Sequence, residues 1–251
     1  MARIYKDLKI VYHGYNLSCK SNALTVNYEV DEKDQTTFCD STMLTFPGLM
    51  KVNAEVDGFM DLDSLANGAV EALINSEVGS TTAKAFSATT GNSAGDAGFF
   101  FEAYMIGSPY LSGSVGDLHE FKMRLANGRS SSSSSGRLVR GTVLQGLTAN
   151  TSASSNTASQ QLGAVASGQT IYAAIHVVST DATSIAFTLR SADNSGMTSS
   201  TTQASFTSVT GVTSEIKSVA GPITDDYWDI AWTRTGGTTF TALMVVGILT
   251  D

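Results

Sequence analysis

The stretch LTVNYEVD at residues 24–31 alternates apolar and polar side chains with a period of two. This period is typical of a β-strand with one buried and one solvated face. A second stretch, KVNAEVD at residues 51–57, repeats the pattern, and the Gly58 that follows indicates a bulge or a close backbone approach. Both stretches place carboxylates on their polar face. We therefore expect two strands, joined by a loop over residues 31–48 that is longer than an ordinary connection.

Strand patterns dominate the rest of the chain. We expect further strands at residues 83–88, 98–106, 115–125, 138–145, 170–179, 184–190, 203–209, 212–218, 227–233 and 239–249. The one expected helix covers residues 62–75, where an apolar stripe runs from Leu62 to Ile74. The sequence thus predicts a mainly β protein with two packed antiparallel sheets, in a β-sandwich or barrel-like arrangement. One flanking α-helix and a strand-rich C-terminal part complete this expected fold.

A serine run at residues 130–135 interrupts the strand pattern, and a second polar stretch follows at residues 148–161. Such runs cannot pack and are typical of exposed loops or linkers. We therefore expect two parts. Residues 1–147 form a β domain with the flanking helix, and residues 148–251 form a β-sandwich-like part that faces outward or is integrated with the first.

The composition argues against several functions. A net charge of −8 disfavours a grip on nucleic acid, which requires Lys and Arg to neutralise phosphates. No apolar run approaches the roughly 20 residues of a membrane helix, and the N-terminus lacks a secretory signal, so we expect a chain made in the cytoplasm without a membrane partner. The two cysteines and the histidines His13, His119 and His176 form no ligand cluster. No metal, and no cofactor of any kind, is expected.

One motif suggests catalysis. Residues 91–95 read GNSAG, the spacing of a nucleophile elbow, and Asp117 and His119 follow in the order of that hydrolase class. An elbow requires a strand before the serine and a helix after it, whereas an aromatic strand is expected after Ser93. We therefore expect no catalytic residues and no enzyme, and keep hydrolysis through Ser93 as the third hypothesis.

Several short segments, in this order and spacing, resemble the tail tube proteins of long-tailed, non-contractile bacteriophages. They are NLSCKSN at 16–22, TTFCD at 36–40, PGL at 47–49, EVDGF at 55–59, VGDLH at 115–119, RG at 140–141, GAV at 163–165 and TDDYW at 224–228. Each is short, and their value is in their collective order. The chain departs from the family at Cys19 and Cys39, where the family's segments carry glycine. This paired replacement raises the hypothesis of a thiol pair between Cys19 and Cys39; the other interpretations are free, partly buried thiols or a bridge formed after lysis.

The resemblance implies a structural subunit that assembles into rings, and the rings stack into a tube through which genomic DNA travels. The strand faces with carboxylates then line the bore, and the candidate lumen residues are Glu29, Asp31, Glu55 and Asp57. Their charge would leave the DNA mobile. The candidates for contacts between stacked rings are Glu32, Asp34, Phe38, Asp40 and Lys6.

The partners implied by the resemblance are further copies of the chain, double-stranded DNA in transit without specific binding, and the tape measure, terminator and baseplate proteins. The implied location is the virion tail, after assembly in the host cytoplasm. A hexameric ring, and a trimeric ring in which each chain supplies two positions, predict similar patterns.

A rival hypothesis belongs to a different class. The aromatic residues Tyr227, Trp228 and Trp232, together with the Ser- and Thr-rich second half, suggest a virion-surface adhesin or carbohydrate-binding β-sandwich. Aromatic rings bind sugar faces, but they also fill cores. The burial of these three side chains is therefore the observation that bears on this alternative.

Overall fold

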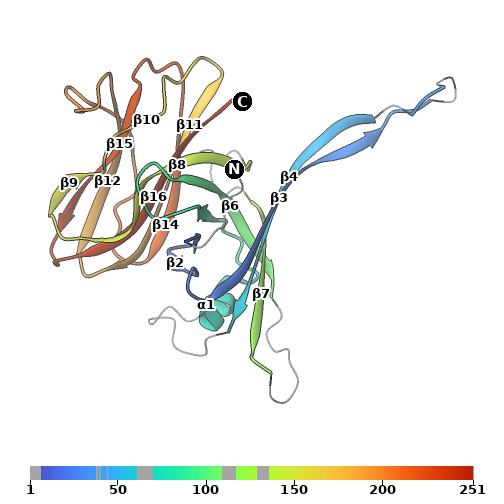
Figure 1. The fold of residues 1–251 in the computed structure, drawn as a ribbon, viewed down its shortest axis with the longest axis horizontal. Helices are drawn as coiled ribbons and strands as arrows, with labels where there is room; N and C mark the ends of the chain where they lie inside the picture. The colour runs from blue at the N-terminus through green and yellow to red at the C-terminus, as the bar shows by residue number, and fades with distance from the viewer. Residues whose placement is uncertain are drawn as a thin grey trace.

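The computed structural model describes residues 7–37, 39, 41–43, 45–60, 70–108, 117–128 and 136–250. It confirms a mainly β protein with two antiparallel sheets and one short α-helix (Figure 1). Among the described residues, eleven strands form the first sheet: β1 (Lys9–Tyr12), β2 (Tyr15–Asn16), β3 (Ser21–Asp34), β4 (Thr45–Phe59), β5 (Lys84–Thr89), β6 (Ala97–Gly107), β7 (Glu120–Asn127), β8 (Val139–Asn150), β11 (Gln169–Thr180), β14 (Thr213–Ala220) and β16 (Phe240–Thr250). Five form the second sheet: β9 (Ser154–Asn156), β10 (Gln160–Gln161), β12 (Ser184–Ala192), β13 (Thr201–Ser205) and β15 (Tyr227–Thr235).

The first sheet divides at β6. The beginning of β6 pairs with β8, and from there the order continues to β16, β11 and β14. The end of β6 pairs with β7, which is followed by β4 and β3. The sheet therefore curls into a half-barrel and extends in two directions from one central strand.

The second sheet packs on β8, β16 and β11 to form a sandwich. Residues 171–177 of β11 are buried on both faces of the strand. Ile171, Ala173 and Ile175 contact the sandwich core around Phe187 and Trp228. The alternate residues Tyr172 and Ala174 of the same strand face a separate cluster with Phe100 of β6 and Val11 of β1. A strand covered on both sides explains why this stretch is apolar on both faces, apart from His176, rather than alternating.

A third cluster occupies the N-terminal half. Val52, Ala54 and Val56 of β4 and Phe121, Met123 and Leu125 of β7 pack there against Phe86 and Phe101. The helix α1 (Val70–Glu77) closes this cluster with Val70, Leu73 and Ile74. The expected helix over 62–75 is thus confirmed from residue 70 and ends two residues later, while residues 61–69 lie outside the described residues.

The boundary proposed after residue 147 falls inside β8, which pairs with β6 at its start and with β16 along its length. One sheet is therefore continuous across that position. The division into domains at residues 1–147 and 148–251 stays a prediction. The serine run at 130–135 lies outside the described residues.

The expected close approach at Gly58 is confirmed, and it gives a test of the packing. A Cβ atom added to Gly58 would overlap the carbonyl oxygen of Lys20 and lie 2.7 Å from a ring carbon of Phe121. Gly58→Ala should therefore lower the free energy of unfolding by roughly 1–3 kcal/mol, measured by denaturant titration. The control is Gly107→Ala, where nothing lies within 4 Å of the added atom. Equal stability of the two variants would contradict the described packing.

Candidate assembly surface

The strands β3 and β4 form a long hairpin, and Figure 1 shows its outer end reaching away from the other strands. We call the part formed by residues 28–34 and 45–50 the outer arm. The pairing of β3 with β4 continues out to Asp34↔Thr45. The neighbour β7 pairs with β4 only between Asn53 and Phe59. Beyond Asn53, both edges of the hairpin are therefore without a strand partner in the described part of the chain.

Long stretches of the expected loop at 31–48 are thus strand. Strand β3 continues to Asp34, and β4 begins at Thr45. The prediction of a loop over this whole range was wrong, because an extended strand exposed on both faces has no alternation of apolar and polar residues to reveal it.

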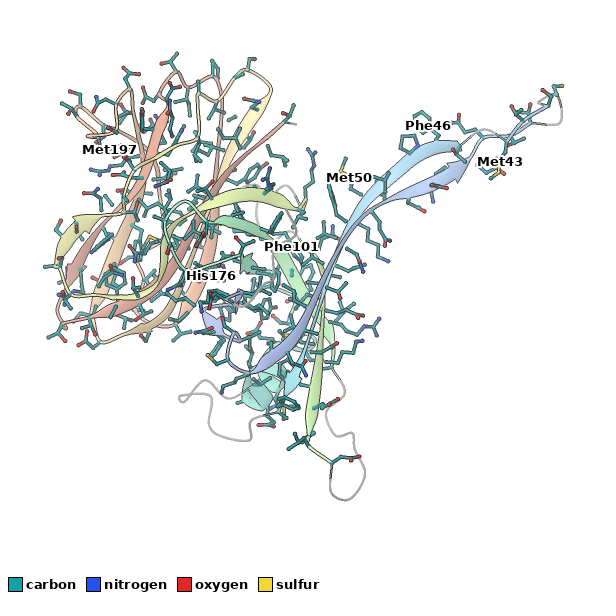
Figure 2. The ribbon with its side chains drawn as sticks, viewed as in Figure 1. Met43, Phe46, Met50, Phe101, His176 and Met197 are labelled. Carbon is teal, nitrogen blue, oxygen red and sulfur yellow. The ribbon has the colours of Figure 1, made fainter. Side chains whose placement is uncertain are left out.

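The outer arm exposes large apolar side chains. Leu49 is 82% exposed and Phe46 is 55% exposed, and Met43 at the end of the hairpin is 71% exposed. Tyr28, Val30 and Met50 are also exposed. Figure 2 shows the labelled side chains Met43, Phe46 and Met50 along this hairpin, away from the body. An isolated two-stranded ribbon is marginally stable in water, and open edges with exposed apolar side chains are typical of surfaces that contact another chain.

The apolar side of the hairpin is continuous with the body. Leu24 and Val26, near the start of β3, pack against the N-terminal core, and Tyr28 and Val30 follow them on the same face. On this face the hydroxyl of Tyr28 donates to the sulfur of Met50 at 3.1 Å. The core of the body thus passes into an uncovered apolar strip along the outer arm.

The opposite face of the hairpin is charged, and it brings three of the four candidate lumen acids together. Glu55 and Asp57 of β4 lie on it, and Glu29 of β3 lies further out, opposite Lys51. Asp31 follows a register shift of the two strands and pairs with Lys33. Their role in lining a lumen stays a prediction.

Two cations that the sequence analysis did not assign to this site also lie on the charged face. The Nζ atom of Lys122 is 3.1 Å from Glu55 Oε2 and 4.0 Å from Asp57 Oδ1, and Arg124 Nε is 3.7 Å from Glu55 Oε1. All four side chains are 38–58% exposed, so each pair contributes at most about 1 kcal/mol. The pairing balances the charge of this face. Only the register of β4 against β7 reveals it, because the partners lie far apart in the sequence.

Two of the five candidates for contacts between rings lie in the described part of the chain. Glu32 and Asp34 are exposed on the outer arm. Phe38, Asp40 and Lys6 lie outside the described residues. The apolar residues Phe46, Leu49 and Met50 are the part of this surface that the sequence analysis missed, and their signal was apolar side chains within a stretch without a strand pattern.

Cys19 and Cys39 do not form a pair within the chain. Both thiols are free and exposed rather than partly buried. Cys19 precedes β3 and Cys39 follows it, so the 14 residues of β3 separate them by about 46 Å. A disulfide requires Cα atoms within about 7 Å. The hypothesis of a thiol pair within one chain was wrong, because the segment between them is an extended strand and not a compact turn.

The described residues do contain a Ser–His contact. Ser87 Oγ of β5 lies 2.7 Å from His176 Nε2 of β11. Neither residue exposes any surface, so no substrate reaches this pair. Burial, and then the nearby His13, lower the pKa of His176 to about 3, which keeps the ring neutral. This contact is a buried structural hydrogen bond between β5 and β11, and Figure 2 labels His176 at its place.

The GNSAG motif lies in the hairpin that joins β5 to β6. The backbone N–H of Ser93 donates to Asp96 Oδ2 at 2.8 Å, and the residues after the turn enter β6. A nucleophile elbow has a helix at this place, so the local structure is that of a β-turn.

The aromatic residues of the adhesin hypothesis are mostly core. Trp228 is completely buried and Trp232 is 5% exposed. Their indole N–H groups donate to the carbonyl oxygens of Gly163 and Ser152. Of the three, only Tyr227 is partly exposed. A sugar-binding platform of these three rings is therefore absent from this side of the sandwich.

None of the helical residues that the structure describes forms a segment long and apolar enough to span a membrane. In the same described ranges, no three His, Cys, Asp or Glu side chains are grouped so that they could hold a metal ion.

No known protein family matches the chain, and no curated protein matches it. Among solved structures, it is similar to the SPP1 Dit (gp 19.1) protein, described as a paradigm of the hub adsorption apparatus in phages that infect Gram-positive bacteria, with 12% identity and a TM-score of 0.39 over 97% of this chain and 100% of that one. A chain of a native gene transfer agent virion gives 12% identity and 0.38 over 55% of this chain and 97% of that one. The structure of infectious bursal disease virus, Gx strain, gives 9% identity and a TM-score of 0.32, over 96% of this chain and 55% of that chain. TM-scores this low do not establish a shared fold.

The buried histidine predicts a specific dependence of stability on pH. The folded-state pKa of His176 lies below its ordinary value, so the unfolded chain binds this proton first, and stability is lost as the pH falls below about 6.5. Between pH 7 and pH 5 this loss amounts to roughly 2 kcal/mol. His176→Gln should reduce the difference in unfolding free energy between these pH values. The control Val177→Ala, also buried on β11, should lower stability equally at both, and an unchanged pH dependence in His176→Gln would refute the account.

Proposed function

We propose that this chain is the repeating subunit of a bacteriophage tail tube, which assembles with itself into stacked rings that form the conduit for the genome. The observation that carries the proposal is the outer arm, with its open edges and uncovered apolar side chains. Such a surface is stable in water when another chain covers it. The ordered set of motifs that resembles long-tailed phage tube proteins indicates that the other chain is a further copy. A structural, non-catalytic role in a virion is the broader form of this proposal.

Each geometric feature has a place in such a polymer. The outer arm contacts the next ring, with Glu32 and Asp34 in this contact. The free edge of β3 and the edge strand β14 are available for pairing with neighbours in the same ring. A heterologous contact of this kind repeats and so gives rings and tubes rather than a closed dimer.

The charged face of β3, β4 and β7 suits the lumen. Its acids are Glu29, Glu55 and Asp57. Of its cations, Lys122 and Arg124 pair with Glu55, and Lys51 lies opposite Glu29. A cation already paired with a carboxylate has less to gain from a phosphate, since DNA affinity grows with the number of phosphates neutralised. DNA therefore passes without being held.

The alternative function, a surface adhesin, loses its main support because Trp228 and Trp232 are buried. The two functions also differ in the state of the purified chain. A tube subunit forms long filaments of uniform width, whereas an adhesin remains a monomer or small oligomer.

The outer arm provides the direct test. The double variant Phe46→Ser with Leu49→Ser should fold as the wild type does, because both side chains are exposed. It should fail to form the filaments that electron microscopy reveals for the wild type. The matched control is Val78→Ser, an exposed apolar residue just after α1, which should leave filaments intact. A wild-type chain that stays monomeric at every concentration and ionic strength would refute the proposal.

The lumen is tested by charge reversal. Glu55→Lys with Asp57→Lys removes the partners of Lys122 and adds two cations to the same face. Assembled tubes of this variant should bind double-stranded DNA at low salt and release it as salt increases, whereas wild-type tubes should not bind. Asp193→Lys, an exposed position after β12 in the second sheet, is the control. If both variants retained DNA equally, Glu55 and Asp57 would not line the conduit.

A further inference from the structure

Both cysteines of the chain belong to the hairpin of β3 and β4, and they mark its two ends. Cys19 lies in the turn just before β3, at the base, and Cys39 lies beyond the end of β3, at the tip. Both thiols are free and exposed. They cannot reach one another within a chain, because an extended strand separates them. A bond between them therefore requires two copies.

The base of the hairpin offers an apolar recess for an apolar tip. A cavity of about 390 Å³ is lined by Leu24 and Val26 of β3, Ala88 of β5, Phe99 of β6 and Leu138. This recess opens on the same face of β3 that continues to the outer arm. At the other end of the hairpin, Met43 and Phe46 are exposed and apolar. One chain thus carries both an apolar knob and an apolar recess, about one arm length apart.

The charges of the two ends are complementary. The outer arm carries Asp31, Glu32 and Asp34 against Lys33. Next to the residues that line the recess, Lys9 pairs in register with Thr89 and Arg140 with Phe99, against the single acid Asp7. The acids Glu55 and Asp57 lie on the opposite face of the hairpin. Opposite charges that meet across an interface favour one orientation of the contact over others.

Resting on the proposed function, we propose that the tip of one copy's hairpin docks at the base of the next copy's hairpin, so that Cys39 of one copy and Cys19 of the next can form a disulfide. The contact is head to tail, and in a stack of rings it leaves free tips at one end and free bases at the other. Every copy inside the assembly then takes part in two such bonds.

The bond forms by thiol–disulfide exchange with a small-molecule disulfide as oxidant. The Cys39 thiol loses its proton and its sulfur attacks the oxidant, which releases one thiolate and leaves a mixed disulfide on Cys39. The Cys19 thiolate of the next copy attacks that sulfur and displaces the second thiolate. Two protein thiols are oxidised and one small disulfide is reduced to two thiols. An oxidising environment outside a cell favours the linked form.

The test uses the full chain, assembled and then treated with oxidised glutathione. Non-reducing electrophoresis of the wild type should give a ladder of multimers, because each copy forms two bonds. Cys19→Ser and Cys39→Ser should each lose the ladder and give monomers alone. A co-assembled mixture of the two variants should give dimers and nothing longer, since only Cys39 of the first variant and Cys19 of the second remain. Peptide mass spectrometry should identify the Cys19–Cys39 link.

The other outcomes separate this inference from the proposed function. Filaments that yield no disulfide, or a Cys39–Cys39 link that gives dimers in Cys19→Ser alone, would overturn the tip-to-base contact and leave the tube subunit standing. A wild-type chain that forms no filaments would overturn both. Unchanged thermal unfolding of the two serine variants shows that a lost ladder reflects the missing thiol rather than a lost fold.

Discussion

The central feature of the structure is the β3–β4 hairpin, whose two strands stay paired beyond the point where β7 stops pairing with β4. Strand β7 pairs with β4 as far as Asn53, and the core covers one side of the hairpin to about the same point. The pairing of β3 with β4 then continues to Asp34↔Thr45 with solvent on both faces and at both edges. Backbone hydrogen bonds alone hold such a ribbon weakly. The outer arm is therefore the part of the described hairpin with the least support from the rest of the chain.

The rest of the molecule is a well-packed body to which the inner end of the hairpin belongs. The sandwich of β8, β16 and β11 with the second sheet buries Phe187 and Trp228, and the opposite side of β11 is buried as well. The half-barrel uses β6 to join this sandwich to β7, β4 and β3. A rigid body with a projecting, partly apolar hairpin is suited to assembly, because burial of the hairpin adds apolar contacts without refolding the body.

The sequence predicted most of the long strands that have a buried face, but it missed the short buried strand β1 and the outer part of the β3–β4 hairpin. Alternation at 24–31 and 51–57 located the inner parts of β3 and β4, and the burial of Trp228, Ile230 and Trp232 follows the alternation of β15. The outer arm has no buried face, so the sequence pattern predicts a loop there. Contacts set by register were also missed: Lys122 and Arg124 reach Glu55, and Arg190 reaches the buried Asp229 at 2.9 Å. Local patterns contain no information on which strands become neighbours.

The most direct measurement is hydrogen exchange of the backbone amides of the outer arm, in the single chain and after assembly. Amides of residues 28–34 and 45–50 should exchange fast in the single chain and become strongly protected in the filament, while amides of β11 stay protected in both. Equal protection of the outer arm in the two states would contradict the claim that another copy covers it.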